Sequence, residues 1–253
     1  MGTETRARID VFSTSDALAQ AAASRFVSAA DEAIQASGRF VVALSGGSTP
    51  KGLYARLVTE PYVSRVEWSR VHWFWGDERC VPPGDPASNH RMTREALLDR
   101  LPVSEARVHR IRGEDDPAEA AAAYERTLRA TFATPAGARF DLVLLGMGDD
   151  GHTASLFPGT AAVRERERWV MAEYARAESM WRVTLTPVVI NAAADVAFLV
   201  VGREKAAMLR RVLEGSYQPD AVPAQAIAPV DGHLRWLVDV TAAADLTGKM
   251  SRP

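Results

Sequence analysis

Short apolar runs alternate with helix-like segments along almost the whole chain. Runs that are apolar on both faces are typical of strands in a parallel sheet covered by helices on both sides. Strands are predicted at 39–45, 71–76, 140–146, 168–172, 181–186, 195–202 and 234–240, and helices at 14–36, 50–60, 90–101, 116–132 and 203–215. This order predicts a single α/β domain over residues 1–253. The expected fold has three Rossmann-like layers, with a mostly parallel sheet and helices on both faces.

Composition narrows the classes of partner. The net charge of −2 gives no overall positive field, so neither nucleic acid nor a membrane surface is an expected partner. No apolar stretch is long enough to span a membrane, and residues 1–12 lack the apolar core of a signal peptide. Cys80 is the only cysteine, which excludes an internal disulfide and fits a small buried residue better than a nucleophile. A cytoplasmic protein is therefore expected.

The loop 45-SGGSTP-50 follows the first predicted strand. Its glycines allow a ligand to approach the backbone closely, Ser48 or Thr49 is expected to cap the next helix, and Pro50 suits the first helical position. The unpaired N–H groups of that helix would then bind an anion. The loop lacks the Gly-Lys-Ser/Thr unit of a phosphate-binding Walker loop, and a plain strand-to-helix turn is the alternative.

A second polar loop, residues 77–89, is predicted after the aromatic strand. It opens with Asp77, Glu78 and Arg79, and ligands bind beyond the carboxyl ends of strands in sheets of this kind. The Arg79 guanidinium could bind an anion or stabilise an oxyanion. The alternative is a solvated cluster of ion pairs on the surface.

The third loop, 146-GMGDDGHTASLFPG-159, matches the spacing of a dinucleotide-binding turn. That reading needs a helix after the glycines, whereas Pro158 would end one, and the carboxylates of Asp149 and Asp150 would repel a pyrophosphate. The loop fits catalysis better. His152 is a candidate general base, and Asp150 could fix the tautomer of its imidazole. The other four histidines show no metal-ligand spacing, so no metal site is predicted.

Two further cations are candidates for anion binding. Arg182 precedes the run 183-VTLT-186, and Lys205 lies at the start of the predicted helix 203–215. A lysine at a helix N-terminus is locally unfavourable, and a bound phosphate would offset that cost. A solvated surface lysine is the alternative reading of Lys205.

Five motifs together resemble the glucosamine-6-phosphate isomerase/6-phosphogluconolactonase family, from about Val41 to Asp239. They are 43-ALSGGSTPKGLY-54, 72-HWFWGDERCVP-82 with 88-SN-89, 143-VLLGMGDDGHTASLFPG-159, 182-RVTLT-186 and 202-GREKA-206.

The resemblance implies a lactone hydrolase that converts 6-phospho-D-glucono-1,5-lactone to 6-phosphogluconate in the pentose phosphate pathway. It implies a small-molecule sugar phosphate lactone as a partner, and neither metal nor organic cofactor. The protein is expected to be a monomer or a weak homodimer. By resemblance, His152 is the general base, Asp150 orients it, and Arg79 lies at the lactone end with Asp77 as a further candidate there. The residues expected to hold the phosphate are Ser45, Gly46, Gly47, Ser48, Thr49, Arg182 and Lys205.

Three other functions are weighed against this one. Glucosamine-6-phosphate deaminases share the Asp-Gly-His unit, but they have a Glu-Pro where this chain has Phe157-Pro158, and Asp-Glu-Tyr where it has Asp77-Glu78-Arg79. A sugar-phosphate sensor would need no His152 and Asp150. A nicotinamide dehydrogenase would need the dinucleotide turn that Pro158 argues against. The lactone ring size, the oxyanion-binding group and the roles of Glu78 and Cys80 stay open at this point.

Overall fold

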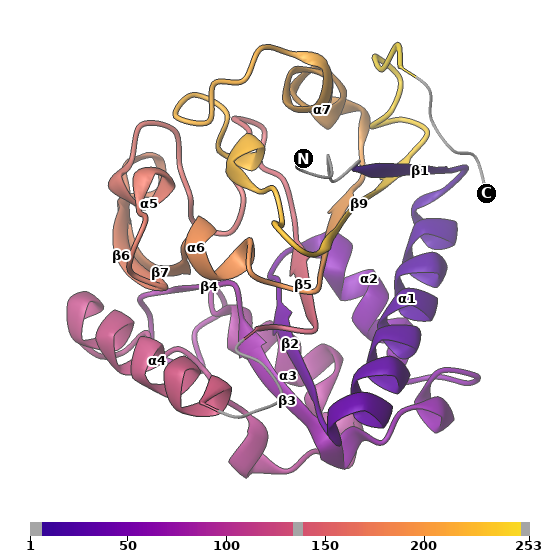
Figure 1. Ribbon diagram of the computed structural model, residues 1–253, viewed down its shortest axis with the longest axis vertical. Coiled ribbons are helices and arrows are strands. Elements are labelled where there is room, and N and C mark those ends of the chain that lie inside the picture. Colours follow the sequence, from indigo (N-terminus) through magenta and orange to yellow (C-terminus); the bar gives the residue numbers. More distant parts are fainter. Residues whose placement is uncertain (1–6, 134–138, 249–253) are drawn as a thin grey trace.

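The computed structural model describes residues 7–133 and 139–248, and the start of the N-terminal stretch 1–12 lies outside this part. Its larger sheet has six parallel strands in the order β1-β9-β8-β5-β2-β3 (Figure 1). These strands are β1 Arg8–Phe12, β2 Phe40–Leu44, β3 Val71–Trp75, β5 Leu142–Leu145, β8 Asp195–Val200 and β9 His233–Asp239. Strands β2, β5 and β8 are buried at every residue. The predicted mostly parallel α/β fold is confirmed.

A second, antiparallel sheet has the order β4-β7-β6, with β4 Asp77–Arg79, β7 Met180–Leu185 and β6 Val170–Ala175. The prediction of a loop over 77–89 is therefore wrong for its first three residues. Their three charged side chains do not form the apolar pattern by which strands are predicted. These residues form a strand because their backbone pairs with β7, about a hundred residues later along the chain.

The helices are α1 Ser15–Ser37, α2 Ser48–Leu57, α3 Asn89–Ala96, α4 Pro117–Phe132, α5 Ala161–Arg164, α6 Pro187–Ile190 and α7 Ala206–Glu214. Helix α1 begins where the Thr14 hydroxyl accepts a hydrogen bond from the backbone of Ala17, and α4 begins where Asp116 caps its first turn. Helix α3 ends at Ala96, earlier than predicted, because the chain tightens into a 3-10 turn at Leu98–Arg100.

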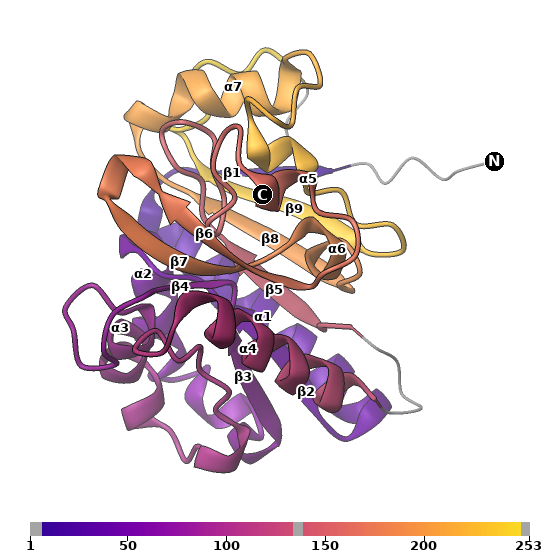
Figure 2. The same ribbon diagram turned by 90° about the vertical axis from the view of Figure 1, so that its left-hand side faces the viewer.

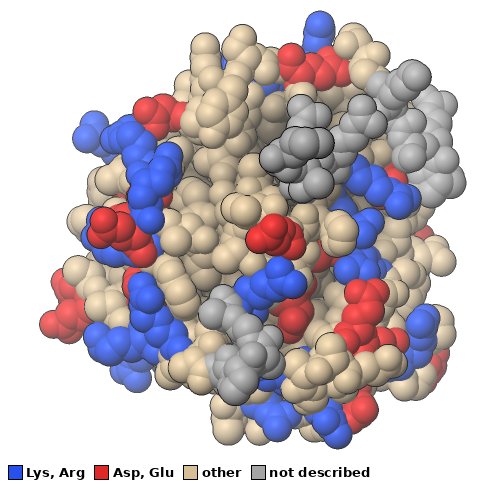
Figure 3. Space-filling model, in the orientation of Figure 1, with Lys and Arg blue, Asp and Glu red and all other residues tan. Residues whose placement is uncertain are grey.

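The helices and the second sheet form layers on the two faces of the main sheet. Helices α1 and α2 pack together on one face, whereas α4 and the second sheet lie on the other (Figure 2). On the face seen in Figure 3, positive and negative side chains are interspersed. None of the helices within 7–133 and 139–248 has both the length and the apolar character needed to cross a bilayer.

The sheet order creates a crevice between β2 and β5. From β2 the chain moves outward to β3, then returns to the other side of β2 as β5 and continues to β8 and β9. Connections that leave neighbouring parallel strands in opposite directions open a crevice at their carboxyl ends, where ligands bind in sheets of this kind. The loops after β2, β5 and β8 all start at that end.

A pair of histidines at the edge strand β3 predicts a stability that depends on pH. His72 Nδ1 lies 3.2 Å from His109 Nε2, and burial together with the nearby positive charge of His109 and Arg107 lowers the pKa of His72 to about 4. Burial also lowers the pKa of His109. The ordinary pKa of histidine is about 6.5. When the pH is below this value, these two histidines bind fewer protons in the folded protein than in the unfolded chain, so stability falls as the pH drops towards about 4.

We therefore expect the melting temperature to fall from pH 7 to pH 5, and His72→Gln to reduce that fall. Differential scanning fluorimetry of the two proteins across this range is the measurement. Parallel curves of melting temperature against pH would show that the histidine pair is not the source.

Candidate active site

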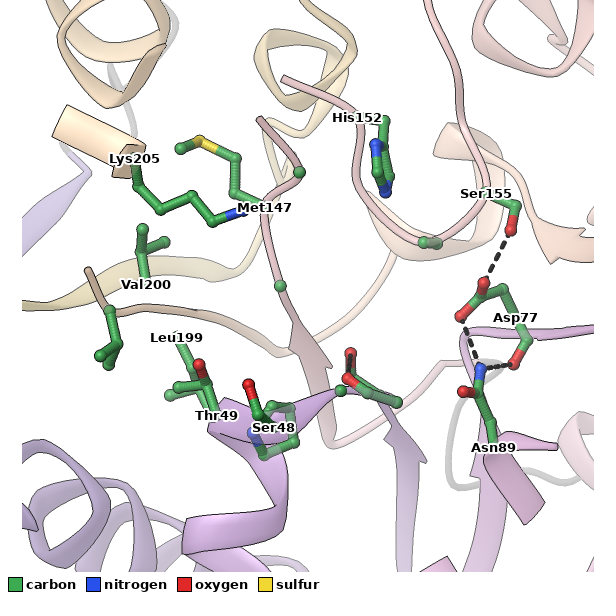
Figure 4. A pocket seen from close by; sticks show the side chains of 18 of the residues that line it. Ser48, Thr49, Asp77, Asn89, Met147, His152, Ser155, Leu199, Val200 and Lys205 are labelled. Carbon is green, nitrogen blue, oxygen red and sulfur yellow. Dashed lines mark hydrogen bonds between the residues drawn. The ribbon is translucent and has the colours of Figure 1, made fainter. Parts of the chain in front are cut away.

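One pocket, of about 430 Å³, opens at the carboxyl ends of β2, β5 and β8. Its wall also includes residues of β4 and β7 from the second sheet. Figure 4 shows Lys205 on one side of this space, Asp77 with Asn89 on the other, and His152 between them. All the residues predicted for the site line this pocket except Asp150, which contacts the lining residue His152.

The His152–Asp150 pair has the geometry of an oriented base. Asp150 Oδ1 lies 2.6 Å from His152 Nδ1 and also accepts the backbone N–H of His152 at 3.0 Å. The hydrogen bond from His152 holds the pKa of the Asp150 carboxyl below its usual range. An ionised carboxylate only accepts hydrogen bonds, so Nδ1 is the donor in this contact, and in a neutral imidazole Nε2 would then hold the lone pair.

Two glycines of this loop allow His152 to take its position. A Cβ atom on Gly148 would lie 2.1 Å from His152 Nδ1, so only glycine leaves the imidazole room against the backbone. Gly151 has a φ of 82°, the left-handed conformation that gives the bend before His152. No helix forms over 146–160, as the position of Pro158 predicts. The loop therefore lacks the helix that a dinucleotide-binding turn requires.

Glu78 has a structural role that the sequence left open. Its carboxylate is 3% exposed and accepts hydrogen bonds from the backbone N–H groups of Arg79, Asn89 and His90 and from the hydroxyl of Ser88. Burial raises the pKa of Glu78 in spite of these donors. Glu78 thus fixes the start of α3 against β4, which places Asn89 at the pocket.

Arg79 and Arg182 lie side by side on paired strands. They are opposite one another in the β4–β7 register, and each has a buried Nε with no hydrogen-bond partner within the described part of the chain. Arg79 donates to the carbonyl of Ala87 at 2.6 Å, and Arg182 forms an ion pair with Glu178. Burial and the charge of Arg79 lower the pKa of Arg182. Two adjacent guanidinium groups with unused donors in one pocket favour an anionic ligand.

The opposite side of the pocket holds Lys205 and the start of α2. Lys205 lies in a 3-10 turn before α7 and forms an ion pair with Asp149. Helix α2 starts at Ser48 with Gly47 as its cap residue and no side-chain capping bond, so the prediction that Ser48 or Thr49 caps it and that Pro50 is its first residue is wrong. The glycine cap offers no side-chain acceptor to the N–H groups at the start of the helix, which favours the binding of an anion there.

Sequence reasoning missed several pocket residues. Asn89 lay in a quoted motif, but no pattern gave it a role, and Ser155 lay in the histidine loop without one. Glu178 carried no signal, because only the turn between β6 and β7 brings it to Arg182. Cys80 lies outside the pocket lining, and burial raises the pKa of its thiol to about 11, which disfavours a nucleophilic thiolate.

The chain matches a family of known proteins over most of its length. The family described as glucosamine-6-phosphate isomerases/6-phosphogluconolactonase matches residues 13–236. The chain belongs to this family. A 6-phosphogluconolactonase from Nostoc sp. is 43% identical over 220 residues, which cover 86% of this chain and 89% of the relative. One from Mycobacterium leprae is 38% identical and covers 96% and 99% of the two chains.

Solved structures agree with the family assignment. The 6-phosphogluconolactonase from Trypanosoma brucei superposes with a TM-score of 0.84 at 31% identity, covering 96% of this chain and all of its own. A monomeric glucosamine-6-phosphate deaminase superposes with a TM-score of 0.81 at 22% identity, a likeness of fold alone. A 6-phosphogluconolactonase and a glucosamine-6-phosphate deaminase thus both share this α/β architecture, so the fold alone does not distinguish the two activities.

Proposed function

We propose that this protein is a 6-phosphogluconolactonase, which hydrolyses 6-phospho-D-glucono-1,5-lactone to 6-phosphogluconate. The observation that carries the proposal is the oriented His152–Asp150 pair, of which His152 lines a pocket that also holds unsatisfied anion-binding groups. The relatives named 6-phosphogluconolactonase that match nearly the whole chain support the same activity.

In this proposal His152 activates water. Its Nε2 removes a proton from a water molecule as the water oxygen attacks the lactone carbonyl, and the carbonyl oxygen becomes an oxyanion. When the C1–ring-oxygen bond breaks, the ring oxygen takes the proton back from Nε2, and the product acid then releases its own proton to solvent. General base catalysis of this kind contributes about 10²–10⁴-fold. A lactone is an activated ester, so the reaction needs no covalent intermediate.

The pocket cations supply binding and charge stabilisation. In our proposal the Ser45–Thr49 loop, Arg182 and Lys205 hold the phosphate, while Arg79 and Asp77 face the lactone end. Arg182 lies opposite Arg79 in the strand register. It therefore lies between the residues that would hold the phosphate and those that would face the lactone. The phosphate contacts would hold the carbonyl carbon near His152, which turns binding energy into orientation.

Phe157 separates this function from the deaminase activity of the same family. Its ring lies 4.8 Å from that of His152, centroid to centroid, and it lines the pocket. Proton transfer to carbon in a deaminase needs a further carboxylate, and an aromatic hydrocarbon cannot provide one. We therefore favour lactone hydrolysis.

A pH-stat assay on freshly prepared 6-phosphogluconolactone tests the proposal. We expect acid release well above the spontaneous rate, and no ammonia from glucosamine 6-phosphate. Acid release at the spontaneous rate with tight binding of substrate would instead indicate a sugar-phosphate sensor. Ammonia release would indicate a deaminase.

A further inference from the structure

Asp77 is a buried acidic residue in the wall of the pocket. The residue is 8% exposed, and Arg182 on the paired strand β7 is the cation whose charge interacts with it. Within residues 7–133 and 139–248, no Lys, Arg or His nitrogen approaches it within the 4.0 Å of an ion pair. A buried carboxylate is costly unless hydrogen-bond donors surround it. The structure therefore has to supply neutral donors, and it does so from two other elements.

Ser155 and Asn89 supply these donors. Ser155 Oγ donates to Asp77 Oδ2 at 2.7 Å, and Asn89 Nδ2 donates to the Asp77 backbone carbonyl at 2.9 Å and to Oδ1 at 3.3 Å (Figure 4). Ser155 is itself held in place, because its backbone N–H donates to Thr184 Oγ1 at 3.1 Å. Ser155 and Asn89 are 0% and 3% exposed, so bulk water does not compete for these bonds.

These contacts leave acceptor capacity on the carboxylate. Two carboxylate oxygens offer about four lone-pair sites, and one good and one long hydrogen bond occupy at most two of them. Asp77 lines the pocket, so these remaining sites are available to a ligand that enters it. A sugar lactone presents hydroxyl donors there, whereas its phosphate and its developing oxyanion would be repelled.

We propose that Asp77 recognises a ring hydroxyl of the sugar lactone, and that Ser155 and Asn89 are positioning residues that hold its carboxylate. This inference rests on the proposed lactonase function and adds a determinant of substrate specificity to it. The network also joins the two parts of the site. Ser155 follows His152 by three residues in one loop, and Asp77 precedes Arg79 by two residues in β4. The hydroxyl contact and the general base are therefore held at a fixed spacing.

Deoxy analogues of the substrate test the inference. In a 1,5-lactone the free ring hydroxyls are those on C2, C3 and C4, so the wild type is assayed on 6-phosphogluconolactone and on its 2-, 3- and 4-deoxy analogues. A hydrogen bond to a charged group predicts that kcat/KM for one analogue falls by roughly 10- to 100-fold. In Asp77→Asn the acceptor is neutral, and the same preference should shrink to about 2- to 10-fold.

Ser155→Ala should shift the same ratio in the same direction as Asp77→Asn, by about threefold or more. Ser64→Ala is the matched control. Its hydroxyl also donates to a carboxylate at 2.7 Å, that of Glu60, but on an exposed turn outside the pocket, so the ratio should not change. A purely structural role of Ser155 would lower kcat/KM for the parent and the analogue equally.

The outcomes separate this inference from the proposed function. Absence of wild-type turnover would remove the function itself. Turnover with no preference against any deoxy analogue, or a preference that Asp77→Asn leaves unchanged, would overturn the inference alone. If Ser155→Ala does not fold, the Asp77→Asn comparison decides. A loss in Asp77→Asn equal to that of His152→Ala, with the ratio unchanged, would make Asp77 a reacting group and also overturn it.

Discussion

Replacement of His152 by alanine should lower kcat by about 10²–10⁴-fold while the fold is retained, because the imidazole is the group placed to take the proton of water. The side chain is partly exposed at the pocket, where its ring contacts Asp150 and Phe157, so little packing is lost. Turnover in the pH-stat assay and the melting temperature of the variant are the two measurements. KM should change little, since this residue is not expected to hold the phosphate.

Two further variants make the result specific. Asp150→Asn can present an amide N–H to Nδ1, which would favour the tautomer that carries its proton on Nε2, and we expect a loss that approaches that of His152→Ala. His233→Ala is the control, because His233 is exposed at the start of β9 and outside the pocket lining. If His152→Ala kept near wild-type turnover, another group in the pocket would have to be the general base, and Asp77 would be the first to test.

The parts of the fold that the sequence predicted are those fixed by local pattern. The run 140–146 is largely apolar because layers cover both faces of the sheet at β5, which also has a neighbouring strand on each edge. A strand buried in this way can be predicted from its own residues alone. Strand β1 was missed because its charged residues Arg8 and Asp10 break the apolar run. Within the described residues it pairs with β9 alone, at the edge of the sheet.

The residues of the candidate site that could be predicted are those whose own sequence neighbourhood is unusual. A histidine beside two carboxylates in a glycine loop is unusual in sequence, and the structure brings His152 and Asp150 into contact. Lys205 was noticeable because a lysine at the start of a predicted helix is locally unfavourable. The pairing of Arg79 with Arg182 could not be predicted, since it depends on the register of two strands far apart in the chain. The contact of Ser155 with Asp77 likewise needs the second sheet in place.

Replacement of Lys205 by methionine should raise KM for 6-phosphogluconolactone by roughly 10- to 100-fold and leave kcat nearly unchanged. A charge-assisted hydrogen bond to phosphate contributes about 1.5–3 kcal/mol, and in this variant it is lost equally from the ground state and the transition state. The variant also leaves the Asp149 carboxylate without its cation, which adds repulsion against the phosphate. Methionine keeps the length of the aliphatic stem, so packing in the turn before α7 is disturbed little.

A substrate without phosphate decides whether Lys205 acts in this way. On glucono-1,5-lactone, which lacks the phosphate, the variant and the wild type should have the same kcat/KM, and inhibition by inorganic phosphate should weaken in the variant alone. Arg203→Met is the matched control. It removes one positive charge from the same 3-10 turn, but Arg203 forms an ion pair with Asp245 and lies outside the pocket lining. Equal losses on the two lactones would mean that Lys205 supports the pocket and does not bind phosphate. An unchanged KM would remove it from the site.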